Sequence, residues 1–110
     1  MNNWTTVCEE NDLIPGTGVC ALLGDEQVAI FKIRKDSSVY VISNYDPIGK
    51  ANVLSRGMTG SLGDALVVAS PLYKQHFNLE TGECIEDAEQ SVKTYRVRVE
   101  SGKVQVQSAA

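Results

Sequence analysis

The side chains that could carry metal or redox chemistry are few and widely spaced. Cys8, Cys20 and Cys84 form no Cys-x-x-Cys pair, and His76 is the only histidine. The separation of His76 from Cys84 matches no local zinc or cluster spacing. We therefore interpret the three cysteines as reduced, small packing residues, and His76 as a hydrogen-bonding residue of a loop.

Two other patterns resemble catalytic or binding motifs only loosely. Asp46, Ser70 and His76 could form a hydrolytic set, but Ser70 lacks the flanking glycines of a Gly-x-Ser-x-Gly turn. The stretch GMTGSLG, residues 57–63, lacks the lysine of a phosphate-binding loop and has no βαβ context. The sequence thus favours neither a serine hydrolase nor a nucleotide-binding loop.

The elements that would position these residues are predicted to be β-strands. Turn-forming residues recur about every ten positions, and the runs between them are rich in Val, Ile, Thr and Tyr, which is typical of an all-β sandwich or barrel. Hairpins are predicted at residues 35–37 and at Ser101-Gly102. Only Asp87–Ser91 is expected to form a helical turn. We expect strands at Trp4–Cys8, Gly18–Leu23, Gln27–Arg34, Ser38–Ser43, Ala65–Ala69, His76–Asn78, Lys93–Glu100 and Lys103–Gln107.

One segment interrupts this rhythm. Residues 44–63 contain several glycines and Asp46-Pro47, and we expect no strand there. A loop of this length inside a compact domain is usually functional. The stretch NYDPIGK begins it, and a second loop-forming stretch, ASPLYKQHFNLETGEC, covers Ala69–Cys84.

Size and charge exclude several classes of protein. The 110 residues, 43% apolar and 22% charged, indicate a single globular domain, residues 1–110, with an ordered core of about 4–107. A net charge of −4 without a basic cluster argues against nucleic acid as a partner. We expect no membrane segment, because no apolar run reaches ~20 residues. The N-terminal stretch has no signal-peptide pattern, and we expect a cytoplasmic protein.

The two loops and the strands around them resemble the Rieske [2Fe–2S] domain family. In that family the first loop reads Cys-x-His and the second Cys-x-x-His, and these four side chains hold the cluster. Here the matching positions are Asp46, Ile48, Ser70 and Tyr73, while Pro47, Gly49, Pro71, Phe77 and Thr81-Gly82-Glu83 keep the surrounding pattern. The resemblance implies a Rieske-like antiparallel β-sandwich or barrel. Its smaller, loop-rich former cluster-binding subdomain covers about residues 44–84 and has lost its ligands.

Within that family the chain is similar to the small subunits of bacterial assimilatory NAD(P)H-dependent nitrite reductases. The marks are Trp4-Thr-Thr-Val-Cys8, the NYDP loop and the SPLYKQ loop. The resemblance implies a cluster-free accessory subunit of nitrate and nitrite assimilation that is not catalytic alone and has no cofactor of its own. Its expected partner is the large catalytic subunit, which carries FAD, a [4Fe–4S] cluster and sirohaem and reduces nitrite to ammonium.

The large apolar side chains of the loops are the candidate partner interface. They are Tyr45, Ile48, Met58, Leu72 and Tyr73. Aromatic residues and methionine are enriched at interfaces. The same residues could instead pack against each other as a small core in place of the cluster. Two other functions stay open at this point, a Rieske-type ferredoxin with an unorthodox cluster and a free-standing β-sandwich interaction module.

Overall fold

The computed structural model describes residues 4–33, 38–72 and 74–107, and this part of the chain is all-β. Every strand pair is antiparallel, which confirms the predicted fold class. No helix among the described residues is long and apolar enough to cross a membrane. The elements are β1 (Trp4–Glu9), η1 (Glu10–Asp12), β2 (Gly18–Leu23), β3 (Glu26–Lys32), β4 (Val39–Ser43), β5 (Tyr45–Asp46), β6 (Ala51–Asn52), η2 (Leu54–Arg56), β7 (Met58–Leu62), β8 (Ala65–Ala69), β9 (His76–Asn78), η3 (Ala88–Gln90), β10 (Thr94–Tyr95), β11 (Val97–Glu100) and β12 (Lys103–Gln107).

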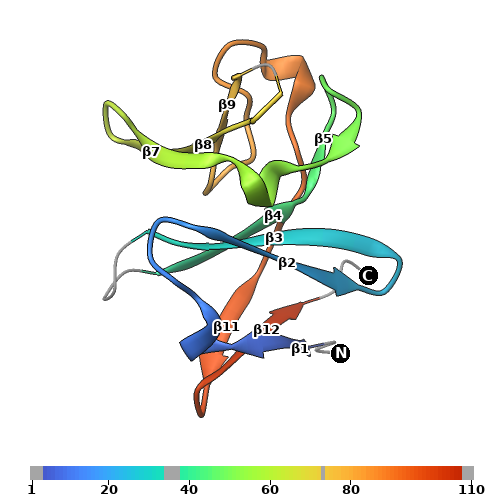
Figure 1. Ribbon diagram of the computed structural model, residues 1–110, viewed down its shortest axis with the longest axis vertical. Coiled ribbons are helices and arrows are strands. Elements are labelled where there is room, and N and C mark those ends of the chain that lie inside the picture. Colours follow the sequence, from blue (N-terminus) through green and yellow to red (C-terminus); the bar gives the residue numbers. More distant parts are fainter. Residues whose placement is uncertain (1–3, 34–37, 73, 108–110) are drawn as a thin grey trace.

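The strands form three layers, as Figure 1 shows. The central sheet has the strand order β10-β4-β3-β2. A sheet of order β1-β12-β11 lies on one side of it, and the β7-β8-β9 sheet with the β5-β6 hairpin lies on the other. The loops that resemble cluster-binding loops belong to the second of these outer layers.

The central sheet is buried on both faces, and strand β3 explains how. Successive side chains of a strand point to opposite faces. Val28 and Ile30 pack in the cluster that contains Val104 and Val106 of β12, while Ala29 and Phe31 pack in the cluster around Phe77 and Cys84. The apolar run VAIF therefore forms two cores at once and ties the loop-bearing layer to the rest of the fold.

The two ends of the described chain leave the fold side by side. Trp4 of β1 is in register with Gln107 of β12. Figure 1 places both ends near the β1-β12-β11 sheet, away from the layer that holds β5 and β9. The predicted hairpin at Ser101-Gly102 joins β11 to β12, and both residues have positive φ, 52° and 77°. The hairpin expected at residues 35–37 falls largely outside the described residues.

The structure corrects two predictions about strands. Residues 44–63 are not strand-free, since β5, β6 and β7 lie there. Strand β7 is largely exposed and contains Gly60, so it is held by pairing with β8 rather than by a local apolar pattern. The single strand predicted at Lys93–Glu100 is two, because the chain pairs with β4 up to Tyr95 and with β12 from Val97.

Candidate functional site

The first loop is anchored at its base by Asn44, which is 1% exposed. Its amide Nδ2 donates to Gln27 Oε1 (3.1 Å), and its Oδ1 accepts from the backbone N–H of Ser55 (2.7 Å). Its backbone also bonds to Gln27 and to Leu54. These bonds join both ends of the loop to the central sheet, so the residues between them have a fixed platform.

Asp46 organises the loop above this platform. Its carboxylate is fully buried, and Oδ1 accepts the backbone N–H groups of Ile48 (2.8 Å) and Gly49 (3.0 Å). Its backbone carbonyl accepts from Lys50 N (2.7 Å). An aspartate before proline is suited to this turn, because its side chain can bond to backbone groups two residues ahead. The carboxylate is thus an internal brace of the loop.

Ser70 braces the second loop as Asp46 braces the first, and it contacts Asp46. It is fully buried, its hydroxyl accepts the N–H of Leu72 (3.2 Å), and its backbone N–H donates to the carbonyl of Gln75 (2.9 Å). The same hydroxyl donates to Asp46 Oδ2. A direct hydrogen bond therefore joins the two loops at the positions that correspond to cluster cysteines in the family.

These residues do not fit a [2Fe–2S] cluster. Such clusters take thiolate and imidazole ligands, whereas Ile48 has no donor atom and the Asp46 carboxylate already accepts from two N–H groups and the Ser70 hydroxyl. No group of three or more His, Cys, Asp or Glu side chains among the described residues is placed to hold a metal ion. The fourth position, Tyr73, lies outside the described residues.

The candidate interface residues fall into separate places. Ile48 is half-buried against the Phe77 cluster. Leu72, 45% exposed, lies so close to Gly49 that a Cβ there would collide with it. Met58, 77% exposed, begins β7 opposite Ala69. Tyr45, 43% exposed, lines a groove of about 270 Å³ together with Leu22. Of the described candidates, Ile48 and Leu72 lie on the joined loops, Met58 pairs at the end of β8 that leads into the second loop, and Tyr45 lines a separate groove.

His76 and Cys84 form no metal site, but both lie beside Glu86. The backbone N–H of His76 donates to Glu86 Oε1 (2.8 Å), and the imidazole Nδ1 is 2.6 Å from Oε2. Mainly the first of these bonds lowers the pKa of the Glu86 carboxyl below 4.5. Cys84 is fully buried, and burial raises the pKa of its thiol. Cys20, by contrast, is exposed, which corrects its interpretation as a packing residue.

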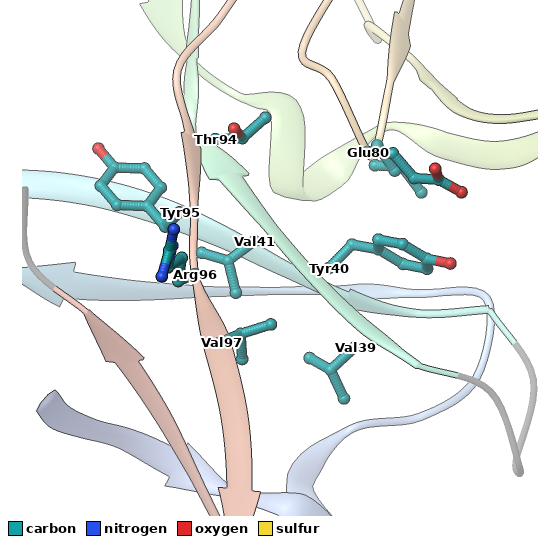
Figure 2. A pocket seen from close by; sticks show the side chains of 9 residues that line it. Val39, Tyr40, Val41, Glu80, Thr94, Tyr95, Arg96 and Val97 are labelled. Carbon is teal, nitrogen blue, oxygen red and sulfur yellow. The ribbon is translucent and has the colours of Figure 1, made fainter.

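A further hollow lies between the layers, where sequence reasoning predicted no site. It measures about 570 Å³ and is shown in Figure 2, with Val39, Val41 and Val97 in the middle, Tyr40 and Glu80 to one side, and Thr94, Tyr95 and Arg96 to the other. Its lining contains no cysteine, histidine or serine. The sequence gave no signal of the hollow. Apolar and polar residues alternate without a break through Arg96, the position at which the segment that follows β10 stops pairing with β4.

Comparison with known proteins places the chain in a family. A model of the Rieske-like [2Fe-2S] domain matches residues 3–107. The nitrite reductase (NADH) small subunit of Escherichia coli K12 is 51% identical to this chain, and the match covers 96% of this chain and 98% of the E. coli protein. The NMR structure of the E. coli protein NirD superimposes with a TM-score of 0.92 at 49% identity, covering both chains fully.

A third relative has a different size. The nitrite reductase [NAD(P)H] large subunit of Klebsiella oxytoca is 41% identical over 94% of this chain, but the match covers 11% of that protein. The same domain therefore occurs both as a separate chain and inside a large subunit. This chain belongs to the Rieske-like [2Fe-2S] domain family and, within it, to the small subunits of NADH nitrite reductase.

Proposed function

We propose that the chain is the non-catalytic accessory subunit of an NAD(P)H-dependent nitrite reductase and acts by binding the large catalytic subunit. The observation that carries this proposal is the K. oxytoca large subunit, which contains a domain matching nearly the whole of this chain. In K. oxytoca this domain is covalently joined to the rest of the large subunit. We infer that the separate chain binds its large subunit as that domain contacts its own. The separate E. coli small subunit fits the same arrangement.

The residues of the loops support an accessory role. The buried Asp46 and Ser70 are engaged in bracing the loops, and Ile48 cannot bind iron. Electron transfer from NAD(P)H to nitrite would use FAD, a [4Fe–4S] cluster and sirohaem, and we propose that the large subunit carries all of them. Residues 1–110 act as one cytoplasmic unit in this proposal, with residues 44–84 as the former cluster-binding subdomain.

The contact surface in this proposal is the tip formed by the joined loops. Leu72 is exposed there beside Gly49 and near Ile48, so it presents apolar surface that a partner could cover. Tyr73 follows in sequence and stays a candidate from the sequence alone. Tyr45 lines a separate groove and Met58 lies at the end of β8 that leads into the second loop, and both are secondary candidates.

The test is co-purification of the tagged chain with the large subunit, followed by an assay of nitrite-dependent NADH oxidation. We expect a complex with activity, and a small subunit that alone contains no iron or acid-labile sulfide. Iron and sulfide in the isolated chain would favour the ferredoxin alternative, and a chain that never binds the large subunit would favour the free-standing module.

A matched pair of variants tests the contact surface. Leu72→Ser should weaken the complex, whereas Leu62→Ser should not. The two leucines are 45% and 44% exposed. Leu62 pairs with Ala65 at one end of β8, and Leu72 follows the other end of this strand, which is about 13 Å long. Equal binding by both variants would exclude the loop tip as the contact.

A further inference from the structure

The charge of this protein is concentrated in one part of the chain. Residues 44–92 contain seven acidic and three basic side chains, a formal charge of −4, whereas the remaining residues contain seven of each. The run from Leu79 to Val92 has five acidic residues and no lysine or arginine. The loop-bearing layer is therefore acidic, and the rest of the chain taken together has no net charge.

A groove of about 410 Å³ opens in this acidic part, between the first loop and the segment around η3. We call it the acidic groove. Neither Asp87 nor the neighbouring Glu89 forms an ion pair with a described residue. Both side chains are exposed. The groove is lined by Pro47, Ile48 and Lys50 from the first loop, by Gln75 from the second, and by Glu86, Asp87 and Gln90.

Gln75 adds an unmet hydrogen bond to these charges. Its Oε1 is the one buried side-chain oxygen or nitrogen of the described residues that has no hydrogen-bond partner. Buried polar groups in native proteins are nearly always paired, and an unpaired one calls for an explanation such as a partner that is absent. Gln75 lines the groove, and a rotation of its side chain would present this covered oxygen to a hydrogen-bond donor that enters there.

We propose that the acidic groove receives a basic side chain of the large subunit, with arginine as the best fit. An arginine offers several N–H donors in a rigid planar fork, which can serve the Gln75 amide and the carboxylates of Glu86 and Asp87 together. Arginine is also enriched among the residues that dominate binding at interfaces. The inference rests on the proposed function and specifies how the same end of the molecule recognises its partner.

The groove adjoins the loop tip, which gives the interface an apolar part beside a polar one. Ile48 lines the groove and also belongs to the tip. Charged anchors bind best when neighbouring apolar contacts exclude water from them. Lys50, the one cation of the groove, forms no ion pair with a described residue and would repel a basic side chain.

The affinity of the large subunit for variants of this chain tests the inference. Gln75→Met removes the amide and keeps the length of the side chain, and Asp87→Asn removes one charge but can still cap η3, where Asp87 accepts from Glu89 N. Each should raise Kd about five- to tenfold, the effect of losing one important interface contact. Asp64→Asn, in the exposed β7-β8 turn, is the control and should bind like wild type.

Stability and salt dependence separate recognition from folding. Gln75→Met should not lower the urea midpoint of the isolated chain, because it removes an unpaired buried oxygen. Wild-type Kd should rise with NaCl more steeply than that of Asp87→Asn. If wild type binds and the Kd of both groove variants is within about twofold of the wild-type Kd, the inference is overturned and the subunit proposal stays intact. A Lys50→Ala variant that binds most weakly would also overturn it, by indicating an anionic occupant. No binding of wild type would overturn both.

Discussion

Replacing Asp46 by alanine should cost a large part of the stability of this protein. The carboxylate is fully buried and accepts the N–H groups of Ile48 and Gly49 and the hydroxyl of Ser70. Removing it leaves three donors without an acceptor, and a buried unsatisfied group costs about 1–3 kcal/mol. Release of the buried charge offsets part of this cost. We therefore expect a loss of about 3–5 kcal/mol in the free energy of unfolding, out of about 5–15 kcal/mol for a domain of this kind.

Ser70→Ala provides the second arm of a double-mutant cycle. It should cost only about 1–2 kcal/mol, because the carboxylate keeps its two N–H donors and the N–H of Leu72 is near the exposed tip. In the double variant the hydrogen bond between the loops is already absent, so the two effects should fall short of additivity by about 1–2 kcal/mol.

Urea unfolding followed by tryptophan fluorescence and circular dichroism measures these quantities. The single tryptophan, Trp4, lies in β1 with the Arg98 guanidinium 4.4 Å from its ring centroid, in a different layer from the loops. Its signal therefore reports unfolding of the whole fold rather than of the mutated loop. A loss below about 1 kcal/mol for Asp46→Ala, or strict additivity in the cycle, would refute the role of this pair.

Three further predictions concern other parts of the chain. Hydrogen bonds from His76 lower the pKa of Glu86, so this carboxylate contributes its full stability only well above its unfolded-state pKa of 4.5, and the contribution is lost as the pH falls through the lower folded-state pKa. The urea midpoints of wild type and Glu86→Gln should therefore converge as the pH falls from about 6 to 3, and parallel curves would contradict this. The exposed Cys20 should react with a thiol reagent in the native protein, whereas Cys84, buried and with a raised pKa, should react only on unfolding; persistence of the fast phase in Cys20→Ser would show otherwise. Fusion of this chain to the large subunit through a flexible linker at its C terminus should keep nitrite-dependent NADH oxidation, because Gln107, the last described residue, pairs with Trp4 in the layer on the other side of the central sheet from the loops; an inactive fusion beside active separate chains would argue against docking through the loop tip.

Local signals in the sequence predicted the elements whose geometry is set locally. The β11-β12 hairpin is one, since Ser101-Gly102 can adopt the two positive φ values that a tight turn requires. Strand β7 was missed because its side chains are exposed and only its pairing with β8 defines it. The division at Arg96 was missed for a related reason, because the partner of the chain changes there while the pattern of residue types does not.

In the candidate site, too, the sequence predicted local features but not the contacts that depend on the tertiary fold. Comparison of motifs identified the positions of Asp46 and Ser70 but not the hydrogen bond between them, which joins residues 24 apart and depends on the tertiary fold. The grouping of Tyr45 and Met58 with the loop tip stays a prediction; Tyr45 lines a separate groove, whereas Met58 pairs with Ala69 next to the second loop. The acidic groove depends on contacts among three segments, so the sequence shows the acidic charge of residues 79–92 but not the groove itself.

The pair of Asp46 and Ser70 explains how the fold keeps the shape of these loops without iron ligands. In a Rieske domain the cluster links the two loops through its bonds to cysteine and histidine. Here one charge-assisted hydrogen bond makes that link, and Ile48 fills space against the Phe77 core instead of facing a metal. A hydrogen bond is weaker than a cluster, so the loops depend more on packing, and Gly49 permits the close contact with Leu72 that this packing requires. Since the new link is buried beneath the tip, the exposed residues above it are free to be selected for partner recognition alone.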